Sequence, residues 1–317
     1  MSTAPYVVTF GETMALMSPD HPGPLAHAST LRLGIGGSES NMAIGLQRLG
    51  VQAVWCGRVG ADSLGELVSR EIRAEGVDVR LTVDDSAPTG LMIKERRTPA
   101  MQRVNYYRTG SAGSRFSAAD LDHDLIRNAA LLHLTGITPA LSGQAAAAVF
   151  EAVATAKAAN IPVSFDLNYR AKLWSPREAA TVYCEILPLV DIVFAGHDEA
   201  EIAVGQAADP GELALRLAGL GPRQAVIKLG AEGALALVDG DVYCQPAVEV
   251  TVVDTVGAGD AFVAGYLAEF VNHESPETRL RTGAATGAFA CLVPGDWEGF
   301  PRRDELLLLA SNEPVRR

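Results

Sequence analysis

The chain has 317 residues, of which 48% are hydrophobic and 20% are charged, so a disordered chain, a collagen and a small disulfide-stapled protein are excluded. This length is near the upper limit for one hydrophobic core, and we expect one large domain with a small appendage. The formal net charge is -12, with 38 acidic and 26 basic side chains. A field of this sign repels polyanions, so nucleic acid is not expected as a partner.

The four cysteines are scattered, at Cys56, Cys184, Cys244 and Cys291. None forms a CxxC pair, which argues against a zinc site and against a disulfide framework. Residues 1–5 carry no basic region before an apolar stretch, so no export signal is predicted. Residues 129–150 lack Asp, Glu, Lys and Arg, but Gly and Pro divide them into two short pieces, so they predict no membrane span. We therefore expect a cytoplasmic protein with no membrane partner.

The first elements in chain order alternate between strand and helix. An apolar run at residues 7–10 predicts a strand, and a helix follows near Ser38 with apolar side chains at helical spacing. Residues 54–59 predict the next strand. Asp62 is a suitable N-cap for a second helix, which Gly76 ends. This alternation is typical of a parallel α/β fold.

Between residues 77 and 108 the spacing of apolar residues changes to two, and two extended runs meet at residues 98–99. This pattern predicts an inserted β layer. The α/β alternation then returns, with a capping box at residues 117–120, a strand at 131–137 and a helix after Ser142.

Later apolar runs predict parallel strands that are buried on both faces. They are residues 162–167, 191–194 and 225–229, followed by a hairpin with Asp239 and Gly240 at its turn and by an extended run at 249–253 that leads into a glycine-rich turn. A Ser-Pro-x-Glu sequence at 175–178 starts a further helix. The fold class is thus α/β, a doubly wound three-layer α/β/α sandwich with a β flap, and ligands should bind at the carboxyl ends of its strands.

The segment most informative about chemistry is residues 254–262, Asp-Thr-Val-Gly-Ala-Gly-Asp-Ala-Phe. Small residues at 257–259 let backbone amides approach an anion, and the dipole of the following helix favours negative charge at the same point. Asp260 would lie in the first turn of that helix, where it could accept a proton from a hydroxyl group. The alternative is an ordinary glycine turn followed by a helix with an acidic first turn.

Two other phosphate-binding motifs do not fit the chain. A dinucleotide fingerprint needs a small residue where Phe262 stands, and no GxxxxGK[ST] sequence is present. A second glycine-helix segment spans residues 34–43, with Gly36 and Gly37 before the helix and Asn41 one turn inside it. The amide of Asn41 could bind sugar hydroxyls.

Together these two segments resemble the signatures of the PfkB or ribokinase family of carbohydrate kinases. Residues 11–12, 106–112 and 166–170 add a resemblance to the 2-keto-3-deoxygluconate kinases of that family, over nearly the whole chain. The resemblance implies a single ribokinase-like domain over residues 1–317, with a β lid built from about 12–35 and 77–110. It also implies site residues: Asp260 as catalytic base, Gly257, Ala258 and Gly259 as anion hole, and Glu12, Gly36, Gly37, Asn41 and Tyr106 at the sugar.

A sugar acid would need local cations, because a chain of net charge -12 offers no long-range attraction to an anion. Arg108 and Arg170 are the candidates, since each lies beside tyrosines and a guanidinium group can bind a carboxylate through two hydrogen bonds. Taken alone, each would more often be a surface arginine shielded by aromatic rings, and the family resemblance reverses that preference.

The nucleotide and metal positions follow from the resemblance. Lys228, Gly230 and Gly233 correspond to the nucleotide-side loop, together with Gly257 and Gly259, although an ordinary strand-turn-strand would show the same pattern. Glu199 is at the acidic position of the family's NxxE motif, which organises Mg²⁺ through water, but Gly196 replaces its Asn and Ala284 replaces an Asn near the nucleotide. Asp254 is a candidate ligand for a monovalent ion, K⁺. The expected cofactors are therefore ATP and Mg²⁺, with K⁺ as a candidate.

The sequence thus predicts ATP-dependent phosphorylation of the terminal hydroxyl of a sugar acid, with 2-keto-3-deoxygluconate and its 6-phosphate as the expected pair. Two alternatives stay open: a kinase for a neutral sugar, similar to fructokinase or ribokinase, and a non-catalytic regulator that binds sugar or nucleotide. An exposed edge of the β insertion also predicts a homodimer formed through the lid.

Overall fold

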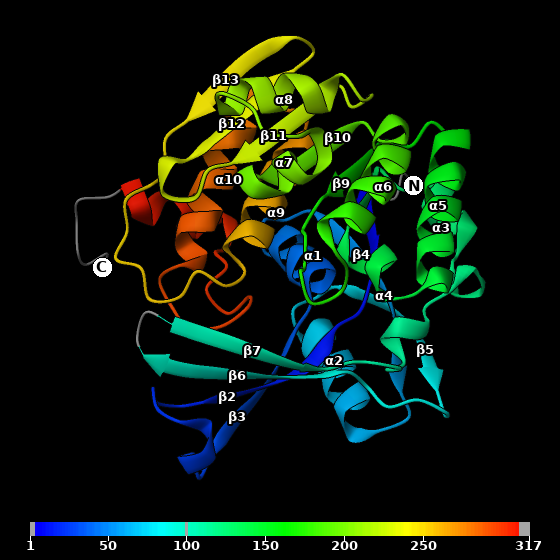
Figure 1. The fold of residues 1–317 in the computed structure, drawn as a ribbon, viewed down its shortest axis with the longest axis vertical. Helices are drawn as coiled ribbons and strands as arrows, with labels where there is room; N and C mark the ends of the chain where they lie inside the picture. Colours follow the sequence, from blue (N-terminus) through cyan, green and yellow to red (C-terminus); the bar gives the residue numbers. More distant parts are fainter. Residues whose placement is uncertain (1–3, 99–100, 311–317) are drawn as a thin grey trace.

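The structure is a computed structural model that describes residues 4–98 and 101–310. Nine strands form one large sheet in the order β13-β12-β11-β10-β9-β8-β1-β4-β5 (Figure 1). Their bounds are β1 Tyr6–Phe10, β4 Gln52–Gly60, β5 Asp78–Asp84, β8 Leu131–Thr135, β9 Val163–Asp166, β10 Ile192–Gly196, β11 Gln224–Lys228, β12 Ala234–Val238 and β13 Asp241–Gln245. Neighbours from β11 to β5 pair in parallel, whereas β12 and β13 are antiparallel. This confirms the mostly parallel sheet.

Helices cover both faces of this sheet, and alternate residues of β1 belong to the two cores that result. Val7 packs with α1 Ser38–Arg48, α2 Ser63–Ala74, α9 Ala258–Val271 and α10 Pro276–Ala290. Val8 packs on the other face with α3 His123–Arg127, α5 Gly143–Ala158, α6 Pro176–Ile186, α7 His197–Val204 and α8 Pro210–Ala218. Because side chains of a strand alternate between faces, one short apolar run supplies both cores.

Shorter helices fill the connections between these layers. They are α4 Ile137–Leu141, η1 Leu25–His27, η2 Gly113–Arg115, η3 Ala118–Asp120, η4 Leu187–Leu189, η5 Gly230–Glu232 and η6 Arg303–Ala310. The predicted strand at 131–137 therefore ends two residues early, where α4 begins.

The polar residues expected to start helices do so. The Asp62 carboxylate accepts a hydrogen bond of 2.8 Å from the amide of Gly65 at the start of α2. The predicted capping box is present at Ser117 before η3, and the helix predicted to start at Ser175 is α6, which also begins with a capping box. These contacts satisfy backbone amides that the first helical turn leaves unpaired.

A second sheet of four strands lies beside the carboxyl edge of the large one, in the order β3-β2-β6-β7 (Figure 1). Its strands are β2 Met14–Pro19, β3 Leu31–Gly36, β6 Leu91–Thr98 and β7 Met101–Tyr107. The insertion predicted between 77 and 108 is wrong at its start, because β5 pairs with β4 as the edge of the large sheet. The alternation of apolar and polar residues in β5 arises because it is an edge strand with one exposed face. An edge strand of either sheet would show the same alternation, so the sequence could not assign β5 to the large sheet.

Two further predictions differ from the structure or lie outside it. The extended run at 249–253 pairs with none of the strands in the described part of the chain and continues into the turn before α9. Pro99, which the sequence placed between two extended runs, lies outside the described residues. Residues 1–3, part of the N-terminal segment in which no export signal was predicted, also lie outside them. Within residues 4–98 and 101–310, none of the helices is long and apolar enough to cross a membrane.

Candidate active site

The turn that begins α9 is held in a conformation that only glycine adopts easily. Gly257 has a φ of 77°, and a Cβ added there would lie 1.8 Å from the carbonyl oxygen of Asp296. Ala258 is the first residue of α9, and its amide donates a long hydrogen bond of 3.3 Å to the Thr255 carbonyl, whereas the amide of Gly259 belongs to the first helical turn, whose donors lack an intrahelical acceptor. Gly257 lines one cavity and Ala258 and Gly259 line another, so the N-terminus of α9 lies where an anion could approach it.

Asp260 lies in this first turn and is held by side chains from another helix. Ser38 Oγ donates to its Oδ1 over 2.6 Å, and Asn41 Nδ2 donates to its Oδ2 over 2.8 Å. Both donors belong to α1, so the two glycine-helix segments found in the sequence meet at this carboxylate. Asn168, after β9, adds a hydrogen bond from Nδ2 to Ser38 Oγ over 2.8 Å.

A cavity of about 100 Å³ lies in front of Asp260, between the large sheet and the small one. All seven residues predicted at the sugar line it: Glu12, Gly36, Gly37, Asn41, Tyr106, Arg108 and Arg170. Gly36 and Gly37 allow the close approach here, because a Cβ on either would lie within 3 Å of neighbouring atoms. The structure thus brings the predicted sugar residues together from both ends of the chain.

The charged residues of this cavity differ in how they are paired. Glu12 is 2% exposed and forms an ion pair of 2.6 Å with Arg108 and a hydrogen bond with Ser111. The side chain of Arg170 is more exposed and donates a hydrogen bond of 3.0 Å to the Tyr169 carbonyl. Glu12 therefore orients Arg108, while Arg170 can bind a substrate carboxylate without breaking an existing ion pair.

A second ion pair in this cavity was not predicted from the sequence. Lys94 on β6 contacts Asp296, and both side chains are less than a tenth exposed. Burial raises the pKa of Asp296 to about 6, and Lys94 opposes that rise. Lys94 stands in an alternating strand and Asp296 in a loop 202 residues away, so no local pattern marks either of them.

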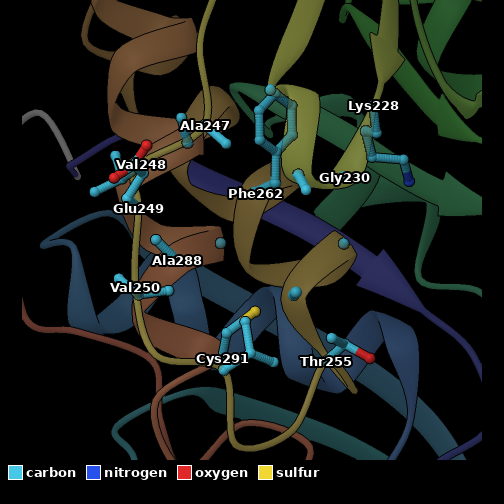
Figure 2. A pocket seen from close by; sticks show the side chains of 17 residues that line it. Lys228, Gly230, Ala247, Val248, Glu249, Val250, Thr255, Phe262, Ala288 and Cys291 are labelled. Atoms are coloured by element: carbon cyan, nitrogen blue, oxygen red, sulfur yellow. The ribbon is translucent and has the colours of Figure 1, made fainter.

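A larger cavity of about 680 Å³ lies on the other side of the α9 N-terminus (Figure 2). Small or apolar side chains from four segments form most of its wall: Ala231, Ala247, Val248, Val250, Val252, Phe262, Ala284, Gly287, Ala288 and Cys291. The predicted nucleotide residues Lys228, Gly230, Gly233 and Gly259 also line it, whereas Gly257 lines the smaller cavity. The residues of 249–253, predicted as extended, supply one wall.

Lys228 forms an ion pair with Asp166. Its Nζ donates to both carboxylate oxygens of Asp166, over 2.8 and 2.7 Å. Burial lowers the pKa of Lys228 and Asp166 raises it, with a net rise, so the lysine stays charged. The pair ties the end of β11 to the end of β9 at the border of the larger cavity.

The candidate metal residues hold the backbone in this structure. Glu199 accepts hydrogen bonds from the amides of Tyr169 (3.0 Å) and Gly196 (2.7 Å), the second being the capping box of α7. Asp254 is 6% exposed and accepts from the amides of Val256 (3.1 Å) and Gly295 (3.4 Å). Their roles toward Mg²⁺ and K⁺ remain predictions.

The large cavity, the glycine turn and the acid beyond it form the arrangement expected of a phosphotransferase, and comparison with known proteins agrees. The family model described as pfkB family carbohydrate kinase matches residues 4–303. The chain belongs to the pfkB family of carbohydrate kinases. This confirms the family, the ribokinase-like fold and the sugar-kinase activity predicted from the sequence.

Individual relatives cover almost the whole chain. A 2-dehydro-3-deoxygalactonokinase of Haloferax volcanii is 37% identical over 292 residues, which is 92% of each chain. A 2-dehydro-3-deoxygluconokinase of Bacillus subtilis is 36% identical over 309 residues, 96% of this chain and 95% of that one. The crystal structure of the 2-dehydro-3-deoxygluconokinase of Thermotoga maritima superposes with a TM-score of 0.89 at 25% identity, covering 97% of this chain and 98% of that one.

Proposed function

We propose that this kinase transfers the γ-phosphoryl group of ATP to the terminal hydroxyl of a sugar acid, with 2-keto-3-deoxygluconate as substrate and its 6-phosphate as product. One observation carries the proposal: two cavities meet at the N-terminus of α9, the larger with an apolar wall and the smaller with Asp260, Arg108 and Arg170. The names of the Haloferax and Bacillus relatives support a substrate of the 3-deoxy-2-keto acid class.

In this mechanism the chain acts mainly by positioning and by electrostatics. The nucleotide occupies the larger cavity, where Lys228, Gly230, Gly233 and Gly259 line the side nearest the sugar. The amides at 257–259 stabilise charge on the transferred phosphoryl group. Asp260 orients the sugar hydroxyl and accepts its proton.

Arg170 decides between a sugar acid and a neutral sugar in our proposal. Among the described residues it has no carboxylate within ion-pair distance, although it lines a cavity in which Arg108 and Lys94 are already paired. A substrate carboxylate would supply the missing partner, with Arg108 held beside it by Glu12. A neutral sugar would leave this cation with no charged partner in the cavity.

The residues next to the phosphate path fit a hydrated Mg²⁺. Asn168 Oδ1 is buried with no hydrogen-bond donor among the described residues, and the neighbouring Tyr169 amide holds Glu199. Carboxylate and amide oxygens are the ligands that Mg²⁺ prefers, and it retains several waters. Asn168 and Glu199 would hold the ion, whose charge neutralises the phosphate oxygens. A monovalent ion at Asp254 is a further part of the proposal.

The four-stranded sheet is the proposed lid. Tyr106 and Lys94 reach from its strands β7 and β6 into the smaller cavity. At about 100 Å³ that cavity is smaller than the roughly 300–1,000 Å³ typical of small-molecule sites, so we expect the sheet to move outward when a sugar binds. Closure then excludes water from the reacting groups.

The homodimer through the lid also remains a proposal. The two edge strands of the small sheet carry exposed apolar side chains, namely Leu31 at 38%, Leu33 at 48% and Tyr107 at 62%. Unpaired strand edges with such side chains favour pairing with a second copy. Light scattering at working concentration should give twice the chain mass, and a monomer would contradict it. A cytoplasmic location stays a prediction from the scattered cysteines.

A coupled ADP-release assay tests the proposed function. The acceptors are 2-keto-3-deoxygluconate, its galactonate epimer, fructose and ribose, each with ATP and Mg²⁺. We expect kcat/KM for the two acids to exceed that for the neutral sugars by at least about 10²-fold, since unpaired cavity charges penalise a substrate that lacks the carboxylate. Preference for fructose or ribose would favour the neutral-sugar kinase, and no turnover with any acceptor would favour the regulator.

A further inference from the structure

Ser38 occupies a position that the proposed mechanism does not yet use. It is the first residue of α1, directly after the two glycines, and it is 8% exposed. Its Oγ lies 2.6 Å from Oδ1 of Asp260, which is 222 residues away along the chain. It also lines the smaller cavity, next to Asn41.

Asn168 determines the direction in which the Ser38 hydroxyl points. Its Nδ2 lies 2.8 Å from Ser38 Oγ and 3.5 Å from Asp260 Oδ1. An amide nitrogen only donates, so the serine oxygen accepts this bond and its own hydrogen is left for the carboxylate. Asn168 is 4% exposed and has a φ of 41°, so the surrounding turn holds it in place.

Both oxygens of the Asp260 carboxylate consequently accept a hydrogen bond from a side chain of α1. Ser38 donates to Oδ1 and Asn41, one turn further along α1, donates to Oδ2. Two donors on opposite oxygens prevent rotation of the carboxylate about its Cβ–Cγ bond, and both donors come from one rigid helix. The remaining lone pairs then face the smaller cavity, in which the sugar hydroxyl must arrive.

We propose that Ser38 is a positioning residue, which, with its orientation fixed by Asn168, holds Asp260 in the geometry needed for proton transfer. The inference rests on Asp260 being the base in the proposed function. A displacement of about 1 Å in a reacting group can lower the rate by roughly 10²-fold, so loss of one of the two donors should act on turnover rather than on sugar or ATP binding.

The test compares two serines of the same helix. Ser38→Ala should lower kcat at least about tenfold and leave KM for sugar and ATP within about twofold. Ser40→Ala is the matched control, because Ser40 is also buried but contacts Thr13 Oγ1 and the Gly37 carbonyl instead of Asp260. Its kcat should stay within about threefold of wild type. Ser38→Thr, which keeps the hydroxyl, should recover most of the lost kcat.

A double-mutant cycle adds a measurement that a general loss of stability would not reproduce. Asn168→Ala should lower kcat more than Ser38→Ala does, because it also removes a proposed Mg²⁺ ligand. The variant with both Ser38→Ala and Asn168→Ala should lose less than the product of the two single losses, because part of each effect runs through the hydrogen bond between Asn168 and Ser38. Additive losses, equal losses in Ser38→Ala and Ser40→Ala, or a kcat of Ser38→Ala within twofold of wild type would each overturn the proposal.

The outcome is separable from that of the proposed function. If Asp260→Asn loses turnover but Ser38→Ala does not, the base assignment stands and the positioning role fails. If Asp260→Asn keeps normal turnover, both fail. A crystal structure of Ser38→Ala gives an independent readout, since the Asp260 carboxylate should rotate away from its wild-type orientation, and an unchanged carboxylate would contradict the proposal.

Discussion

Two glycines in the turn before Asp260 differ in whether the fold leaves room for a side chain, and this difference gives a test of the proposed phosphate site. Gly257 has a φ of 77°, and a Cβ there would lie 1.8 Å from the Asp296 carbonyl oxygen. A Cβ on Gly259 would meet nothing closer than Lys228 Nζ, at 3.7 Å, and would project into the larger cavity. We therefore expect Gly257→Ala to affect folding and Gly259→Ala to affect the nucleotide.

The magnitudes follow from these geometries. An alanine in the left-handed region costs about 1–2 kcal/mol, and the collision with Asp296 adds to it, so Gly257→Ala should lower the free energy of unfolding by at least about 2 kcal/mol. Gly259→Ala replaces a helical glycine, which gains up to about 1 kcal/mol. Its methyl group would nevertheless keep phosphates from the amides, so kcat/KM for ATP should fall at least about tenfold.

Urea unfolding and steady-state kinetics on both purified variants measure the two effects. The expected pattern is a destabilised Gly257→Ala and a Gly259→Ala that is at least as stable as wild type but impaired with ATP. Normal ATP kinetics in Gly259→Ala would refute the placement of the phosphates at this turn. Unchanged stability in Gly257→Ala would show that the contact with Asp296 does not constrain the turn.

Three further predictions concern the base, the cations and a buried histidine. Asp260→Asn should lower kcat at least about 10²-fold with sugar binding nearly intact, and near-normal turnover by steady-state assay would contradict its role as base. Arg170→Ala should raise KM for acid sugars far more than for neutral ones, at unchanged stability. Arg108→Ala should have the same kinetic effect and should also lower the free energy of unfolding in urea by about 3 kcal/mol, because it leaves the buried Glu12 unpaired. Equal kinetic losses on both sugar classes would argue for a neutral substrate. Burial, followed by the charge of Lys228, lowers the pKa of His133 to about 3. Below about pH 6.5 the unfolded chain therefore binds a proton at His133 that the folded chain does not bind. The free energy of unfolding consequently decreases as the pH is lowered. Between pH 7 and 5 wild type should lose about 2 kcal/mol more than His133→Gln, and parallel urea titrations would contradict this.

Local sequence determined most of the elements in this protein. The Asp62 cap, the Ser175 capping box and the Asp239–Gly240 hairpin depend on residues within three or four positions, so their signals were readable. Position 257 must be glycine because its φ is positive and because Asp296, 39 residues away, lies against it, and the motif around it predicted the turn that we propose binds phosphate. The β5 strand was misplaced because an alternating pattern describes one exposed face and contains no information about the sheet that its edge joins.

The tertiary structure decided which side chains share a charge or a hydrogen bond. Lys94 and Asp296 are 202 residues apart, and Ser38 and Asp260 are 222 apart, so neither pairing leaves a periodic trace in the chain. The sequence could name Arg108 and Arg170 as equal candidates for a carboxylate. Only the fold shows that Glu12 already pairs with one of them, because burial and the choice of ionic partner are properties of the packed core, whereas caps and turns are properties of neighbouring residues.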